Sequence, residues 1–295
     1  MPPLSTVLTA VTLDPAAVVL ALVAAALYGV GLRRARRAGV RWPLWRAACF
    51  YALGIVPYVA LACGFTGAYG SSLRWAFALK IALMFFVVPL VAGLGRPLGL
   101  ARATLGEAGR ARLERIMASR PVRTLGNAFV APIVGLVLFG TFLTPLFHLY
   151  RSDPVLSGAL SVAAPLIGLI LALPLTEADS FERSSAFIVV EFVYVFIELL
   201  ADAIPGIFLR LSPTVLDGVT SWAAGAPAWF PSPLRDQQLA GDLLWFIAEA
   251  VDIPVIILMF VRFSRTDRRE ATSYDELSDE EMEALADEHL RRRNR

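Results

Sequence analysis

The chain has 295 residues, of which 57% are hydrophobic and 18% are charged, and its formal net charge is only +2. Soluble domains are about 45–50% apolar and about 25% charged, so this composition excludes an ordinary soluble protein. A transmembrane helix needs about 20 apolar residues. Seven stretches approach that length: Pro15–Leu32, Trp45–Phe65, Leu73–Leu94, Asn127–Tyr150, Val155–Leu175, Ala186–Leu209 and Leu239–Val261. We therefore expect an all-α fold, a polytopic membrane bundle of about seven transmembrane helices.

Arginines are concentrated in alternate gaps between these stretches. Five follow the first stretch, seven lie between residues 96 and 123, and eight follow the seventh, whereas the opposite gaps hold only Arg74, Arg151, Arg210 and Arg235. Because positively charged loops stay cytoplasmic during insertion, we expect the N-terminus outside and the C-terminus inside a bacterial-type plasma membrane. The arginines are split among separate loops, so we expect lipid head groups as their partners and no nucleic acid.

The sequence divides into a membrane domain over residues 1–265 and a polar cytoplasmic tail over residues 266–295. In the tail, Ser278 and Glu281 form a capping box that predicts a short acidic helix. The basic segment 96–123 is predicted to be helical and to lie along the inner membrane surface. The first stretch is long enough to span the membrane and follows no basic region, so a cleaved signal peptide is not expected. Cys49 and Cys63 lie about 21 Å apart along one expected helix, too far for a disulfide.

Several short motifs carry a resemblance to a known family. Asp236-Gln-Gln-Leu-Ala-Gly-Asp-Leu-Leu-Trp245 opens the seventh stretch, and three others lie at the ends of earlier stretches: Gly67-Ala-Tyr-Gly-Ser-Ser72, Leu94-Gly-Arg-Pro-Leu98 and Leu143-Thr-Pro-Leu-Phe147. With these motifs in order, the chain resembles the CtaG family of cytochrome c oxidase assembly proteins over roughly residues 15–270. The resemblance implies an integral membrane factor for the maturation of haem–copper oxidases in the respiratory chain. It implies oxidase subunits as partners and copper as the associated metal.

The resemblance also implies where a metal would bind, because family members carry membrane histidines as their expected ligands. When the family's pattern is placed on this sequence without gaps, its histidines correspond to five positions. None of the five is a histidine in this chain: Phe77, Ile81, Ser161, Ala163 and Asp202. The chain's two histidines, His148 and His289, are expected on opposite sides of the membrane. A copper site needs several converging soft or imidazole ligands. We therefore expect no cofactor or metal site, and copper enters by resemblance alone.

One lysine lies at the level of these positions. By a helical rise of about 1.5 Å per residue, the five positions share one depth on three helices, and Lys80 lies at that depth. A lysine or aspartate in the membrane core costs about 2.5–3.5 kcal/mol, so each should have a partner. We predict an ion pair between Lys80 and Asp202, with the ammonium in the place of the metal cation. The alternative is that Lys80 extends to the outer interface.

Carboxylates also line the last two stretches. Glu191, Glu198 and Asp202 share one stripe of the sixth, and Glu249 lies on the seventh with Asp252 about 60° around the helix. An intramembrane carboxylate is a candidate functional group. These residues could form a proton or cation path, or they could share hydrogen bonds as structural groups.

Two functional classes fit the sequence, and an enzyme is not among them. No nucleotide-binding loop, nucleophile elbow or HExxH motif occurs in a suitable context. The first class is a membrane assembly factor for a haem–copper oxidase. The second is a small membrane transporter or ion-conducting protein that uses the intramembrane carboxylates.

Overall fold

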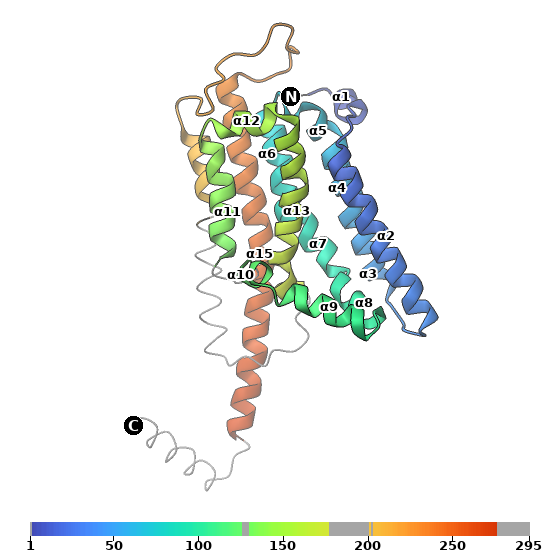
Figure 1. Ribbon diagram of the computed structural model, residues 1–295. Coiled ribbons are helices and arrows are strands. Elements are labelled where there is room, and N and C mark those ends of the chain that lie inside the picture. Colours follow the sequence, from blue (N-terminus) through green and yellow to red (C-terminus); the bar gives the residue numbers. More distant parts are fainter. Residues whose placement is uncertain (1, 126–129, 177–200, 202, 276–295) are drawn as a thin grey trace.

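The computed structural model describes residues 2–125, 130–176, 201 and 203–275 (Figure 1). All regular secondary structure in these residues is helical, which confirms the all-α prediction. Four helices of the described part are long and apolar enough to cross a membrane, or five if one sharply bent pair counts as a single span. The seven-span count and the orientation stay predictions.

The first predicted span is a single helix, α2 (Pro15–Arg37), which follows the short α1 (Leu4–Thr9). Asp14 caps its N-terminus, because its Oδ1 accepts a hydrogen bond from Ala17 N at 3.1 Å. Such a cap satisfies one of the backbone N–H groups that a helix start leaves without a partner. The last turn of α2 is rich in arginine, and the positive charges there interact favourably with the helix dipole.

The second and third spans share an unusual backbone. Each joins two α-helices through a π-helical turn, and the segments in order are α3 (Leu44–Ala48), η1 (Cys49–Ile55) and α4 (Val56–Cys63), then α6 (Arg74–Ala82), η2 (Leu83–Val87) and α7 (Val88–Leu94). A proline, Pro57 or Pro89, stands two residues after each π-helical turn. Proline has no N–H and clashes with the carbonyl four residues earlier. A wider turn accommodates the ring, so each span continues through its proline.

Helix α13 (Pro154–Thr176), the fifth predicted span, packs against the second of these turns. A Cβ at Gly168 would lie 2.0 Å from Phe85 O and 2.8 Å from Pro89 Cγ. Phe85 is the residue whose carbonyl Pro89 cannot bond. The missing side chain at Gly168 therefore allows α13 to approach the turn closely.

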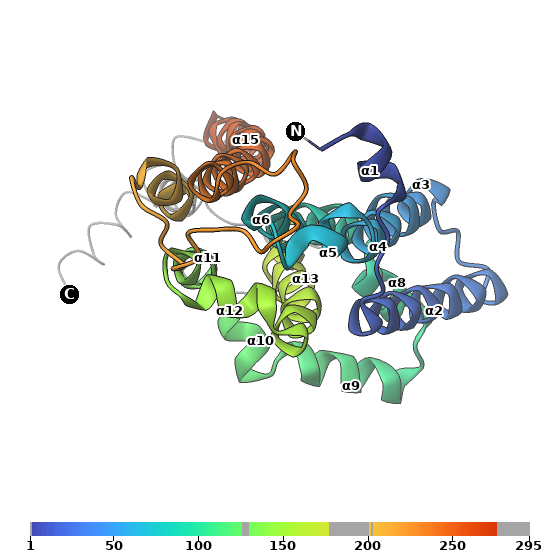
Figure 2. The same cartoon turned by 90° about the horizontal axis from the view of Figure 1, so that it is seen from above.

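Short helices lie at both ends of the bundle (Figures 1 and 2). Helix α5 (Phe65–Gly70) lies at the end that we call the loop end, because residues 212–232 also lie there. Helices α8 (Pro97–Thr104), α9 (Glu107–Met117) and α10 (Arg120–Leu125) lie at the opposite end, the arginine end. These three helices confirm the helical prediction for residues 96–123, with a break between each pair. Their place on a membrane surface stays a prediction.

The fourth predicted span departs from a straight helix. Its described part consists of α11 (Ala131–Gly140), the 3₁₀ turn η3 (Thr141–Leu143) and α12 (Leu146–Ser152). The chain bends by 88° before α12. Thr144 is extended there and Pro145 follows it, and the residue before a proline disfavours the helical conformation. The described part of the stretch Asn127–Tyr150 is therefore a bent pair of helices, and its count as one span stays a prediction.

The sixth predicted span lies largely outside the described residues, which show a helix over 203–211. The seventh lies within α15 (Pro233–Asp275), a helix of 43 residues that continues past residue 265 into the predicted tail. The capping box at Ser278 lies outside the described residues.

Helix α6 lies among α5, α13 and α15 (Figure 2). Its Phe77 is fully buried and packs against Phe142 and Phe147, with ring centroids 6.0 and 6.1 Å away. The rings of Phe142 and Phe147 stack at 4.3 Å. The bend of the fourth span thus places aromatic side chains from both of its sides against α6.

Candidate functional site

A cluster of four buried charges lies at the loop end, and we call it the ionic cluster. Arg74 begins α6, Arg151 lies in α12, Asp217 in the 212–232 loop and Asp236 in the first turn of α15. Arg74 Nη2 lies 2.5 Å from Asp217 Oδ1, and Arg74 Nη1 lies 3.3 Å from Asp236 Oδ2. Arg151 Nη2 lies 2.6 Å from Asp217 Oδ2. The side chains are at most 2% exposed, so the cluster joins four distant segments inside the protein.

Backbone carbonyls and the Asp217 carboxylate accept further hydrogen bonds from the two guanidinium groups, whereas Arg151 Nε makes none among the described residues. Arg74 Nη2 also donates to Val219 O at 2.6 Å, and its Nε donates to Asp217 Oδ2 at 2.9 Å. Arg151 Nη1 donates to the carbonyl oxygens of Ser71 and Ser72, each at 3.2 Å. Buried charges are tolerated when they are paired and hydrogen-bonded in this way.

The cluster contains two positive and two negative groups, so their charges balance. Burial raises the pKa of Asp217, but the hydrogen bond and charge of Arg74 outweigh burial and hold that pKa below its ordinary value. At Asp236 burial is the stronger influence and raises the pKa, because its contact with Arg74 Nη1 is longer, at 3.3 Å. Asp217 is therefore the more firmly ionised carboxylate of the two.

The motif that carries the family resemblance builds this end of the fold. Asp236 accepts hydrogen bonds from the first backbone amides of α6, Arg74 N at 2.8 Å and Trp75 N at 3.3 Å, and so caps a helix other than its own. Gln237 is buried, and its Oε1 accepts from Leu216 N at 2.8 Å. Both side chains therefore attach the start of α15 to segments that are remote in sequence.

A glycine later in the same motif sets a close helix crossing. A Cβ at Gly241 would lie 2.5 Å from Gly206 O and 2.7 Å from Arg210 N. At the next residue of α15, Asp242 Oδ1 lies 2.7 Å from Arg210 Nε, and both side chains are 39% exposed. The small residues permit the close contact between α15 and the 203–211 helix.

Lys80 is buried in the bundle, with 3% of its surface exposed. Its Nζ donates to Ser161 Oγ at 3.2 Å and to Ser157 Oγ at 3.5 Å, and it lies 5.3 Å from the centre of the Phe77 ring. Ser161 in turn donates to Ser157 O, and its own carbonyl accepts from the Tyr58 hydroxyl at 2.9 Å. Lys80 is therefore enclosed by protein and bonded to α13 in the described part of the chain. The ion pair and the alternative in which the side chain extends to the outer interface both stay predictions.

Four of the five positions that the resemblance assigns to the family's histidines lie among the described residues. Phe77 and Ile81 are fully buried apolar side chains, and Ser161 is a buried hydroxyl. Ala163 is partly buried, whereas Asp202 lies outside the described residues, so its ion pair with Lys80 stays a prediction. The described positions provide one hydroxyl oxygen and apolar groups near a lysine. This donor set does not fit copper, which prefers imidazole and sulfur ligands.

The structure describes only some of the predicted intramembrane carboxylates. Glu249 accepts a hydrogen bond from Trp245 Nε1 at 2.9 Å. Asp252 is 8% exposed, and its buried Oδ2 has no hydrogen-bond partner in the described part of the chain. Glu191 and Glu198 lie outside the described residues. Asp252 is therefore a buried acid with one oxygen left unsatisfied.

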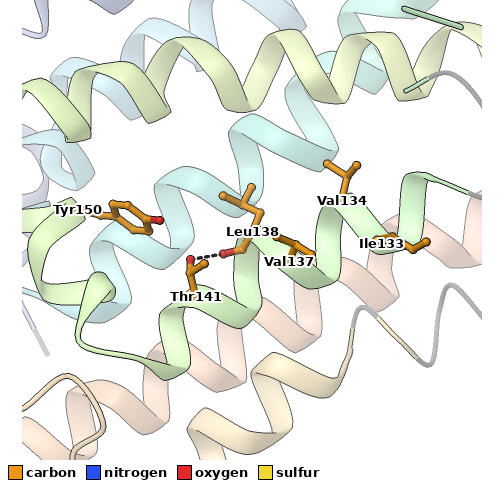
Figure 3. A pocket seen from close by; sticks show the side chains of 6 residues that line it. All are labelled: Ile133, Val134, Val137, Leu138, Thr141 and Tyr150. Atoms are coloured by element: carbon orange, nitrogen blue, oxygen red, sulfur yellow. Dashed lines mark hydrogen bonds between the residues drawn. The ribbon is translucent and has the colours of Figure 1, made fainter. Parts of the chain in front are cut away.

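No group of three or more histidine, cysteine or acidic side chains among the described residues is arranged to hold a metal ion. His148 is exposed on α12, and His289 lies outside the described residues. An open groove of about 350 Å³ follows α11 and η3 (Figure 3), and its lining offers no carboxylate, imidazole or thiol: Ile133, Val134, Val137, Leu138, Thr141 and Tyr150.

The ionic cluster is the site that sequence reasoning missed. Its signal was present, because Arg74 and Arg151 are two of the few arginines outside the basic gaps, and Asp236 opens the recognised motif. Arg74 and Asp217 are 143 residues apart in the chain, so the sequence alone does not indicate that they pair.

Comparisons with known proteins agree with the motifs. The family model for the cytochrome c oxidase caa3 assembly factor, Caa3_CtaG, matches residues 26–266. Uncharacterized protein Mb0105 of Mycobacterium bovis and Uncharacterized protein MT0111 of Mycobacterium tuberculosis are each 26% identical to the chain over 301 residues, which cover 96% of this chain and 44% of theirs. Uncharacterized protein ML1998 of Mycobacterium leprae is 24% identical over 264 residues, covering 85% and 39%.

The chain thus spans less than half the length of these relatives. No solved structure matches it significantly. The family model covers most of the chain, in an all-helical structure with several long apolar helices. The protein is therefore a member of the Caa3_CtaG family of cytochrome c oxidase assembly factors.

Proposed function

We propose that this chain is a multi-pass plasma-membrane factor that assists assembly of a haem–copper oxidase through contact with oxidase subunits. The observation that carries the proposal is the family match over residues 26–266 on a helical bundle with several membrane-length helices. The role is non-catalytic. Contact within the bilayer suits a protein whose long helices, such as α2, expose apolar side chains along most of their length.

We further propose that any copper handling does not use the positions of the family's histidines. Two observations support this: Phe77 and Ile81 are fully buried apolar residues, and the nearby cation is the Lys80 ammonium held by serine hydroxyls. A cationic lysine would repel a copper ion at the same place. The Lys80 region then stabilises the helical bundle and does not bind the metal.

The test is the oxidase activity and the haem spectrum of membranes from a strain that lacks this gene. We expect loss of the haem–copper oxidase, and its recovery on expression of the wild-type chain. The double variant Lys80→Met/Asp202→Asn should restore the oxidase equally well, because it removes the lysine without leaving an unpaired carboxylate at the predicted partner position. An unchanged oxidase in the deletion strain would refute the assembly role.

Metal analysis of the purified chain after incubation with Cu(I) tests the second proposal. We expect no tight copper at the Lys80 region, so the wild-type chain and Lys80→Leu, which adds no metal ligand, should retain equal, substoichiometric copper after chelator treatment. Stoichiometric copper that Ser161→Ala or Lys80→Leu releases would refute the proposal.

The second candidate function is an ion or proton path, and Asp252 favours it. A buried carboxylate with an unsatisfied oxygen is costly unless it holds a proton or a cation. Reconstituted vesicles with a pH-sensitive dye in their lumen provide the test. A proton flux that Asp252→Asn abolishes, and that Asp242→Asn leaves intact, would support this function. The absence of flux in the wild-type chain would exclude it.

A further inference from the structure

The arginine end carries a set of positive charges without acidic neighbours in sequence. No aspartate or glutamate occurs between residues 15 and 106, a stretch that contains Arg33, Arg34, Arg36, Arg37, Arg41 and Arg46. In the part of the chain that the structure describes, no ion pair joins any of these six arginines to a carboxylate. By contrast, Arg102 of α8 at the same end pairs with Glu114 at 2.8 Å. Among the described residues, the six arginines therefore have no carboxylate partner.

Arg46 differs from the other five because aromatic rings fix it. Its Cζ lies 4.9 Å from the centre of the Trp42 ring and 5.6 Å from that of Trp45. Trp42 is itself held, since its Nε1 donates to the Tyr28 hydroxyl at 3.1 Å, and that hydroxyl donates to Gly95 O at 2.8 Å. The Arg46 guanidinium is thus positioned in advance of binding, which lowers the entropy cost of holding a ligand.

The same guanidinium has an unused donor. Arg46 Nε is buried and makes no hydrogen bond among the described residues. A guanidinium that stacks on aromatic rings keeps its N–H groups in its own plane, where they match the oxygens of a phosphate. Arg46 Nε itself is covered, but the residue is only partly buried. The rest of its guanidinium therefore offers a prepared contact for a phosphate-type anion.

The apolar neighbours of Arg46 indicate what carries that anion. Leu44 is 79% exposed and Trp45 is 55% exposed, directly beside the arginine. The apolar part of α2 ends at Leu32, immediately before its arginines begin. A ligand at this level meets phosphate-binding and apolar side chains together, as a phospholipid does at the membrane interface.

We propose that Arg46, with Trp42 and Trp45, forms a specific site for the head group of an anionic glycerophospholipid, and that the neighbouring arginines strengthen it. The occupant is a lipid and not a free anion, because the exposed Leu44 and Trp45 side chains gain from contact with acyl chains. This site is independent of the oxidase-assembly role.

Thermal unfolding of the purified full chain in a neutral detergent tests the site, with phosphatidylglycerol titrated at fixed detergent. We expect a saturable rise in the unfolding temperature with phosphatidylglycerol and a much smaller rise with phosphatidylcholine. In Arg46→Gln, half-saturation should need roughly tenfold more phosphatidylglycerol, since a charge-assisted contact is lost. Arg102→Gln is the matched control and should titrate like the wild type, because Arg102 is already paired with Glu114.

Three results would overturn the proposal. Equal stabilisation by phosphatidylcholine would mean that acyl chains alone bind. Equal stabilisation by inorganic phosphate at the same concentration would mean that the site takes a free anion. An equal loss in Arg37→Gln and Arg46→Gln would mean a diffuse charge effect without a site at Arg46. If Arg46→Gln does not fold, Arg46→Lys keeps the charge without the planar fork and should still weaken phosphatidylglycerol binding.

Discussion

Replacing Asp217 by asparagine tests whether the ionic cluster holds the loop end together. The change leaves two guanidinium groups with a single carboxylate, so an uncompensated positive charge stays buried beside Arg74 and Arg151. Removal of one partner from a buried ion pair costs about 3–5 kcal/mol. Asp217 bonds both arginines, so we expect a loss in the upper part of that range. Unfolding in mixed micelles of increasing SDS fraction, followed by tryptophan fluorescence, measures the free energy.

The matched control for Asp217→Asn is Asp242→Asn. Asp242 also pairs with an arginine, Arg210, but both side chains are 39% exposed, and pairs of that kind contribute about 0–1 kcal/mol. Because the folded-state pKa of Asp217 is below its ordinary value, its stabilisation is complete above about pH 5 and is lost as the pH falls through that lowered pKa. Equal losses in the two variants, or an acid dependence as large in Asp217→Asn as in the wild type, would refute the assignment.

Two further predictions concern packing and the buried lysine. Gly168→Ala should lower the unfolding free energy by about 1–3 kcal/mol through overpacking, whereas Gly140→Ala, where a Cβ meets nothing within 4 Å, should leave it unchanged. Lys80→Met should lower the unfolding free energy by about 3–5 kcal/mol if Lys80 pairs with Asp202. The added change Asp202→Asn should restore most of that free energy. The same unfolding assay measures both, and a single Lys80→Met variant of unchanged stability would contradict the ion pair.

The sequence predicted the helical class and, to within two residues, the bounds of the second, third and fifth apolar stretches, whereas the first helix continues past the predicted Leu32 to Arg37. Length and apolarity are local properties of the sequence, so they can be predicted without knowledge of the fold. The sequence did not predict the bend at Thr144. Pro145 is visible in the sequence, but the 88° angle of the bend depends on the aromatic packing around α6. Pro57 and Pro89 are a local indication of the two π-helical turns, but the turns were not predicted from them.

The ionic cluster could not be predicted, for a different reason. Topology placed Arg74 and Arg151 in gaps between spans, where side chains are usually solvated. Their burial depends on Asp217, which a long loop brings over the end of α6 (Figure 2). Sequence patterns locate residues along a helix or within a loop, but they do not state which loop folds back onto which helix.

These contacts also give a physical account of why the chain resembles its family without the family's histidines. The recognised motif supplies Asp236, which caps α6, and Gly241, which permits a close helix crossing. Neither contact involves a metal. Because α6 carries both Phe77 and Lys80, the motif fixes the helix that a metal site would use, whatever side chains that helix presents. The contact that holds α6 in place is therefore separate from the positions at which the resemblance implies metal ligands.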